Sequence, residues 1–130
     1  MKRESWLAAA PESAATARAI VREAAGEQGL DDGAIWDLML ATTEAVSNAV
    51  LHGQGCDETG AIRLRIQTTE DGVFIEVCDC GRFTRRVVSE HSVGGRGIPI
   101  MSAVTDDFEL LPETGGTRVR FGKRLVAAAA

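Results

Sequence analysis

The sequence lacks the features that place a chain in a membrane or in an oxidising compartment. Its 130 residues contain no run of about 18 apolar residues, the length that a membrane-spanning helix needs. The start of the chain, Met1–Trp6, has no long apolar stretch of the kind found in a secretory signal peptide. The three cysteines cannot make an even disulfide framework. We therefore expect a reduced, cytoplasmic protein without a membrane partner.

The sequence is also short of positive charge and of metal-binding patterns. It carries 14 lysines and arginines against 19 aspartates and glutamates, a net charge of −5, which argues against direct contact with nucleic acid. Cys78 and Cys80 form a Cys-x-Cys pair, but zinc needs about four ligands, and only Cys56 and two histidines remain elsewhere. The pair is better explained as a small strand residue followed by a loop residue.

What the sequence does contain is the pattern of one α+β domain. Helical spacing dominates the first part of the chain, and alternating strands with one inserted helix follow. The first expected elements are a strand at Arg3–Ala8 and a helix that starts near Ser13 and ends at Gly29. A second helix follows, which Asp31 or Asp32 caps and which runs to Gly53. The remaining elements are strands at 62–67 and 73–79, a helix at Ile100–Val104 with Pro99 in its first turn, and strands near 107–111 and 117–121. This order predicts a two-layer α/β sandwich, a mostly antiparallel sheet with helices on one face. It occupies residues 1–126, and residues 127–130 form a frayed tail.

The opposite face of that sheet is expected to be charged. It would carry Arg63, Arg65, Glu76, Arg118 and Arg120. We expect solvated cross-strand pairs there, with a protein contact as the second choice.

One stripe of polar residues follows the second helix. Glu44, Asn48 and His52 are four residues apart, and a four-residue step advances only about 40° around a helix. A carboxylate and a carboxamide one turn apart can provide a proton acceptor and an oxygen ligand for Mg²⁺. The alternative is that the stripe is the solvent-facing side of an amphipathic helix, opposite the apolar set. That apolar set is Ile35, Met39, Val46 and Val50.

Two strand ends and two glycine-rich segments add to this stripe. Strand alternation places Asp79 on the apolar, core side of its strand, where a carboxylate must be satisfied by a backbone group or by a ligand. Thr117 holds the equivalent position on the last strand and follows one of the two glycine-rich segments, Gly115-Gly116. The run Gly94–Gly97 enters a helix, and free N–H groups at a helix start can bind phosphate. Asp79 can accept a hydrogen bond from an exocyclic amine such as that of adenine.

These segments together resemble a known superfamily. The run Glu44-Ala-Val-Ser-Asn48-Ala-Val-Leu-His52 is similar to the N box of the gyrase and histidine-kinase ATPases, which share the Bergerat fold. Asp79-Cys-Gly81 resembles the first glycine box, Gly95-Arg-Gly97-Ile98 the second, and Gly116-Thr117 the last. The small size and the short lid look most like the anti-sigma factor serine/threonine kinases, over roughly Arg3 to Phe121.

The resemblance implies a set of roles. Asn48 would hold Mg²⁺, Asp79 would bind adenine and Glu44 would act as the general base. The other residues implied to line ATP are Gly81, Gly95, Gly97, Ile98 and Thr117. The implied function is that of an anti-sigma factor: a homodimer that sequesters a sigma factor and uses ATP to phosphorylate a serine of an anti-anti-sigma antagonist.

Two alternatives stay open at this point. Phe83 replaces a glycine that many relatives have, and Thr84-Arg-Arg86 replaces a common acidic-proline pair, so the lid departs from the family pattern. A non-catalytic ATP-binding module that binds a protein partner is therefore the second hypothesis. A catalytic fragment of a sensor histidine kinase is the third, and it is disfavoured because we expect no phospho-acceptor helix before the domain.

Overall fold

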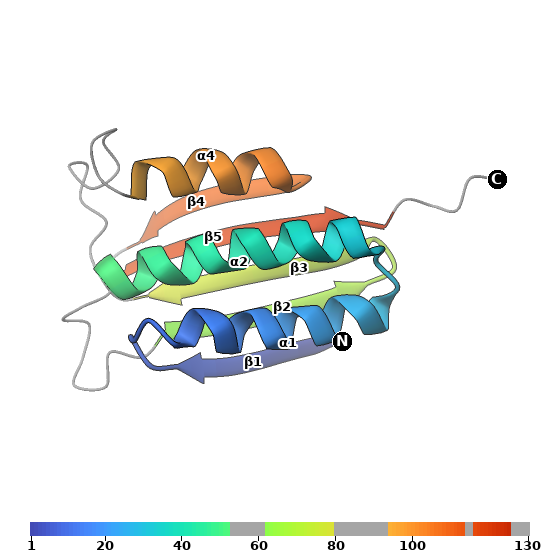
Figure 1. Ribbon diagram of the computed structural model, residues 1–130, viewed down its shortest axis with the longest axis horizontal. Coiled ribbons are helices and arrows are strands. Elements are labelled where there is room, and N and C mark those ends of the chain that lie inside the picture. Colours follow the sequence, from blue (N-terminus) through green and yellow to red (C-terminus); the bar gives the residue numbers. More distant parts are fainter. Residues whose placement is uncertain (53–61, 80–93, 114–115, 126–130) are drawn as a thin grey trace.

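The protein is a helical layer on one face of a single sheet. The computed structural model describes residues 1–52, 62–79, 94–113 and 116–125 (Figure 1). In chain order the elements are β1 (Lys2–Leu7), α1 (Ser13–Gln28), α2 (Asp32–His52), β2 (Ile62–Thr69), β3 (Gly72–Asp79), α4 (Gly94–Val104), β4 (Asp107–Glu113) and β5 (Gly116–Arg124). The strand order is β1-β2-β3-β5-β4, and every neighbouring pair is antiparallel. The predicted two-layer α+β sandwich is confirmed.

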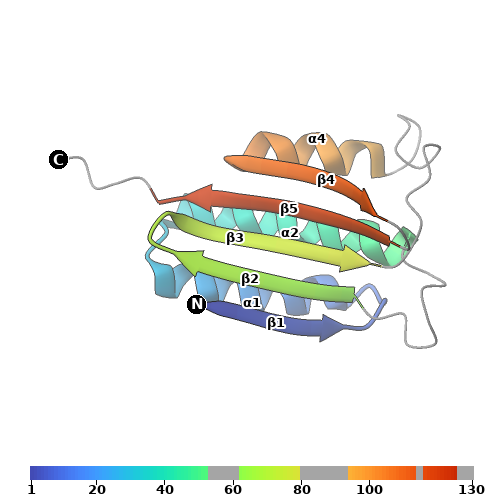
Figure 2. The ribbon, with the colours of Figure 1, turned by 180° about the vertical axis from the view of Figure 1, so that it is seen from behind.

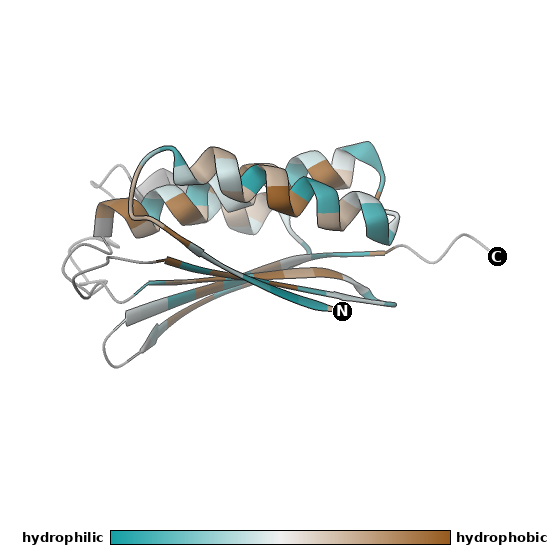
Figure 3. Cartoon of the chain, turned by 90° about the horizontal axis from the view of Figure 1, so that it is seen from below, coloured by the Kyte–Doolittle hydropathy of each residue, from teal (hydrophilic) through white to brown (hydrophobic). Residues whose placement is uncertain are grey.

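The two layers are clearest when the sheet is seen along its edge (Figure 3). All of the helices in the described residues lie on one face, with α2 between α1 and α4 (Figure 1). The other face, which we call the open face, is not covered by any described helix (Figure 2). None of the described helices is long and apolar enough to cross a membrane.

Helix α1 begins and ends where the sequence predicts. The hydroxyl of Ser13 donates a hydrogen bond to the carbonyl of Ala8 at 2.6 Å and joins the helix start to the end of β1. Gly29 follows the helix with φ of 93°, a left-handed conformation that favours glycine, and its N–H bonds back to the last turn. Ala17 and Val21 are fully buried against the rest of the core.

Helix α2 has the predicted ends but a broader buried face. Asp31 caps it, since its carboxylate accepts a hydrogen bond from the N–H of Ala34 at 2.8 Å. Of the predicted apolar set, Val46 is fully buried and Ile35 and Val50 are partly buried against the core, so the prediction holds for these three residues. The fully or almost fully buried residues are Leu38, Ala41, Thr42, Ala45, Val46 and Ala49. Because α2 packs on the sheet and on both other helices, its core face is broad and rich in alanine.

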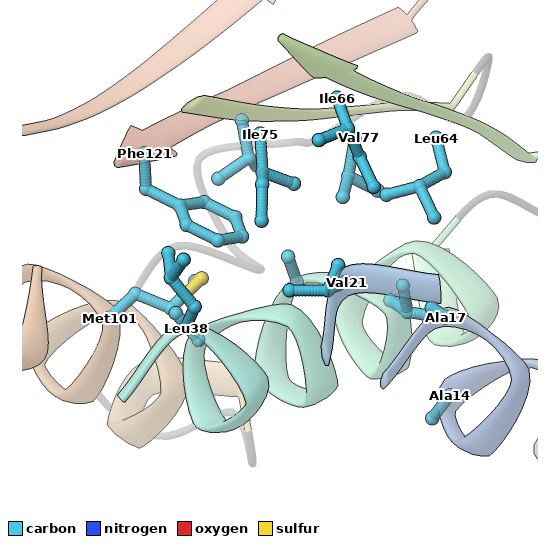
Figure 4. Close-up of a cluster of buried hydrophobic side chains, with 14 of the residues drawn as sticks. Ala14, Ala17, Val21, Leu38, Leu64, Ile66, Ile75, Val77, Met101 and Phe121 are labelled. Atoms are coloured by element: carbon cyan, nitrogen blue, oxygen red, sulfur yellow. The ribbon is translucent and has the colours of Figure 1, made fainter. Parts of the chain in front are cut away.

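The sheet contributes the opposing half of the core. Leu64, Ile66, Ile75, Val77 and Phe121 point towards the helices (Figure 4). They alternate with the residues of the open face, as a two-residue period requires. Each of these five side chains is at most 2 % exposed, so this face is almost entirely removed from water.

Helix α4 starts earlier than predicted. It spans Gly94–Val104 and includes Pro99 in its interior rather than in its first turn. Proline lacks an N–H group, so α4 loses the hydrogen bond that residue 99 would make to the carbonyl of Gly95. The predicted boundary was wrong because proline was taken to mark the first turn. Met101 lies in α4, about one turn before its end, and its side chain is fully buried.

Candidate functional site

Two polar residues face each other across the ends of the central strands. Asp79, the last residue of β3, is the register partner of Thr117 in β5. Both lie on the side of the sheet that faces the helices, as strand alternation predicts, and they are only 9 % and 2 % exposed. Directly opposed residues in an antiparallel pair have Cβ atoms about 4.5–5.5 Å apart. The fold therefore brings a carboxylate and a hydroxyl together at one end of the core.

The hydroxyl of Thr117 has no hydrogen-bond partner in the part of the chain that the structure describes, and its Oγ1 atom is buried. Buried polar groups in native proteins are almost always satisfied, and an exception requires an explanation such as a ligand. This orphan hydroxyl lies beside Asp79, so a polar ligand at this place would satisfy it.

Helix α2 ends at the same edge of the molecule. The last residues of α2 and β3 and the first residues of β5 and α4 lie together at the left of Figure 1. Asn48, one turn before the end of α2, is 5 % exposed, and Glu44, a further turn back, is half-buried. Asn48 is therefore not on a solvent-facing stripe, and that alternative is wrong for this residue.

The remaining predicted site residues belong to segments near α4. Gly95 and Gly97 lie in the first turns of α4, whose start reaches the same end of the sandwich. Ile98 is half-buried and packs against the core. Gly81 and the proposed lid, residues 82–93, lie outside the described residues, as does Gly115.

The residue types at this end suit a magnesium nucleotide. Unpaired N–H groups at the start of a helix bind phosphate, and a carboxamide oxygen is a hard ligand of the kind that Mg²⁺ prefers. A buried carboxylate accepts hydrogen bonds from an amine, and the Thr117 hydroxyl can donate or accept. The polar groups are few and lie at the margin of an apolar core, which is the usual composition of a small-molecule site.

The sequence analysis overlooked a second polar cluster, on the open face behind this site. The guanidinium of Arg63 lies 5.7 Å from the centre of the Trp6 ring, and its Nη2 atom is 3.8 Å from the sulfur of Cys78. Burial raises the pKa of the Cys78 thiol, and the adjacent Arg63 partly opposes that rise. Trp6 and Arg63 are register partners across β1 and β2, and the alternation of β1 alone could have placed Trp6 on this face.

Comparison with known proteins assigns the chain to a family. The family described as "Histidine kinase-like ATPase domain" matches residues 7–123. The chain is 32% identical over 101 residues to an anti-sigma F factor of Clostridium beijerinckii, an alignment that covers 68% of this chain and 69% of the relative. It is 28% identical over 123 residues to the serine-protein kinase RsbW of Bacillus licheniformis, covering 84% and 77% of the two chains.

A solved structure agrees with these matches. The structure of the RsbU and RsbW domains of a Mycobacterium tuberculosis protein superposes with a TM-score of 0.79 at 27% identity. The superposition covers 99% of this chain but only 34% of that longer one.

Proposed function

This chain belongs to the histidine kinase-like ATPase domain family, among the anti-sigma factor serine kinases, and from that premise we propose that it is itself an Mg-ATP-dependent anti-sigma factor kinase. Its substrate would be a serine of an anti-anti-sigma antagonist, and it would sequester a sigma factor. The single observation that carries the proposal is the buried, unpartnered hydroxyl of Thr117 beside Asp79. The proposal includes a cytoplasmic location and a homodimer.

The proposed roles are those that the family resemblance implies, and the positions of Asn48, Asp79 and Thr117 at one end of the sandwich support them. Asn48 holds Mg²⁺, and Asp79 accepts a hydrogen bond from the adenine amine. Thr117 bonds to the nucleotide through its free hydroxyl. The backbone of Gly81, Gly95 and Gly97 lies against the phosphates, with Ile98 as an apolar neighbour. ATP would supply the phosphoryl group.

Glu44 completes the proposed chemistry as the general base. The serine hydroxyl of the antagonist must lose its proton as phosphate is transferred, and Glu44 lies one helical turn from Asn48. A carboxylate that accepts this proton contributes typically about 10²–10⁴-fold to the rate. The half-buried position of Glu44 keeps it close to the metal ligand while a protein substrate can still reach it.

Replacing Thr117 with valine tests the site with almost no change in shape. Because the hydroxyl has no hydrogen-bond partner among the described residues, T117V should leave the free energy of unfolding unchanged or raise it. The same change should weaken Mg-ATP binding by about 1–3 kcal/mol, since a hydrogen bond to a charged ligand is lost. Isothermal titration calorimetry and urea denaturation measure the two quantities separately.

Thr42 provides the matched control. It is fully buried on α2, and its hydroxyl donates to the carbonyl of Leu38 at 2.7 Å. T42V should therefore lower stability by about 0.5–1.5 kcal/mol and leave the affinity for Mg-ATP unchanged. Absence of heat and of thermal shift when wild-type protein meets Mg-ATP would end the nucleotide proposal. Equal affinity in T117V and wild type would remove Thr117 from the site.

A further inference from the structure

The open face of the sheet has a charge opposite to that of the whole chain. The chain carries −5, but the basic side chains on this face outnumber the acidic ones. By strand register, the basic residues are Lys2, Arg63, Arg65, Arg118, Arg120 and Arg124, and the acidic ones are Glu4, Glu76, Asp107, Glu109 and Glu113. This local excess of positive charge would attract an acidic partner that the rest of the molecule repels.

Five of these charges form a row across the whole sheet. Register pairs place Glu4, Arg65, Glu76, Arg120 and Glu109 side by side, with alternating sign. Arg65 contacts both glutamates beside it at 3.4 Å, and Arg120 contacts Glu76 at 3.5 Å. We call these five residues the central row. The three inner residues of the row, Arg65, Glu76 and Arg120, therefore pair with one another within the sheet.

The next row, towards the candidate nucleotide site, differs. Its members are Trp6, Arg63, Cys78, Arg118 and Leu111, so it contains two arginines and no acid. Arg63 contacts Trp6 and Cys78 but forms no ion pair with any described residue, and its Nε atom is buried without a hydrogen-bond partner. Trp6 is 62 % exposed.

We propose that Trp6 and Arg63 form a docking site for an acidic segment of a protein partner. An arginine fork without a carboxylate partner fits a carboxylate of that segment, and the indole holds the fork in place from one side. Tryptophan and arginine are also the residue types that most often dominate binding energy at protein interfaces. An open groove of about 720 Å³ lies on the same face, lined by Phe74 and by residues of the central row, which separates it from Trp6 and Arg63. It has room for the side chains that flank the acidic residue.

A second copy of this chain is a poorer occupant. The central row has the same order of charges from either end, negative at Glu4 and Glu109 and at Glu76 in the middle. A two-fold axis that runs along this row, or across it through Glu76, sets like charges against like charges. Directly opposed like charges are destabilising, so two copies are disfavoured in the arrangements that align their central rows strand for strand.

The docking site goes beyond the proposed kinase chemistry and needs no nucleotide. It lies on the opposite side of the sheet from Asp79 and Thr117. Loss of docking and loss of ATP binding can therefore be measured independently.

Site-specific photo-crosslinking in the native host tests the proposal. Gln67 lies exposed on the open face and lines the groove, so a benzophenone side chain there samples a docked segment. We expect crosslinks to another protein, at a peptide rich in aspartate or glutamate. Arg63→Gln should reduce the yield about tenfold or more, since the carboxylate loses its partner. The crosslink yield of Arg63→Lys should lie between those of the wild type and Arg63→Gln, because lysine keeps the charge and lacks the planar fork.

The matched control is Arg22→Gln, an exposed position on α1 that removes the same charge from the other side of the molecule. It should leave the yield unchanged, and circular dichroism verifies that every variant is folded. Crosslinks to the chain itself, to a peptide without acidic residues, or at equal yield in Arg63→Gln would each overturn the proposal, as would no crosslink at all. Calorimetry with Mg-ATP on the same variants distinguishes this failure from failure of the kinase proposal.

Discussion

The central row of the open face and the polar pair on the helix side differ in how their polar groups are satisfied. In the central row, Glu76 is mostly buried, its side chain 15% exposed, and contacts Arg65 and Arg120 as well as Arg118 in the next row. On the helix side, the hydroxyl of Thr117 is more deeply buried and has no hydrogen-bond partner among the described residues. Polar groups that pair with one another hold the strands together, whereas an unsatisfied group at the margin of the core indicates a ligand. We expect loss of a charge from the central row to alter stability and loss of a polar group from the candidate nucleotide site to alter ligand binding and chemistry.

The largest expected effect is on the helix side. Glu44→Gln keeps the size of the side chain and removes its ability to accept a proton. We expect phosphate transfer to an antagonist to slow by about 10²–10⁴-fold while Mg-ATP affinity stays nearly intact. Single-turnover transfer of labelled phosphate and calorimetry measure the two effects.

Asn48→Ala is the companion variant, and it should weaken Mg-ATP binding because a metal ligand is lost. Transfer at the wild-type rate in Glu44→Gln would show that Glu44 is not the base. If wild-type protein binds Mg-ATP but transfers no phosphate to any antagonist, the non-catalytic module becomes the better description.

The next effect is on the open face. Glu76→Gln leaves three guanidiniums without their shared carboxylate, and we expect a loss of about 1–2 kcal/mol in the free energy of unfolding. The arginines are partly exposed, so added salt should change this loss through screening. Urea denaturation at low and high salt measures it. Glu109→Gln, at the exposed end of the same row, is the control and should have little effect. Weaker Mg-ATP binding in Glu76→Gln would break the distinction between the two faces.

The smallest effect concerns the Cys78 thiol. Burial raises its pKa in the folded chain, with Arg63 opposing and Glu76 reinforcing the rise. The folded protein therefore keeps this proton when the unfolded chain has lost it, so stability is fully present below about pH 9 and falls as the pH rises further. The wild-type free energy of unfolding should fall more steeply above that pH than that of Cys78→Ala. Cys56 and Cys80 are present in both chains, so parallel pH profiles would contradict the prediction.

Strand alternation was sufficient to predict the buried pair. A period of two residues fixes the face of every side chain once one apolar face is known, so Asp79 and Thr117 could be placed from sequence. Their direct opposition could not, because it depends on the register of β3 and β5, which are separated by α4 and β4 along the chain. The contact between Trp6 and Arg63 was missed for the same reason.

The helices were harder to predict in detail. Alanine gives a weak hydrophobic signal, so the sequence analysis assigned the apolar side of α2 to larger residues and did not predict the buried face of Ala41, Ala45 and Ala49. Asn48 is buried because it lies on the edge of that alanine face. In α4, Pro99 suggested a helix start that the backbone does not follow. Gly81 and the arginines of residues 82–93 lie outside the described residues, so their part in the site stays a prediction.

The opposite orientation of consecutive residues at the strand ends constrains how this chain can evolve. Cys78 and Asp79 point to different faces of the sheet, and so do Thr117 and Arg118. Loss or gain of one residue inside a strand turns every later side chain to the opposite face of the sheet. In β5 this change would place Arg118 in the core, and in β3 it would place the carboxylate of Asp79 in water. Substitutions can accumulate at either face, but the lengths of these two strands should stay fixed among relatives that keep the activity.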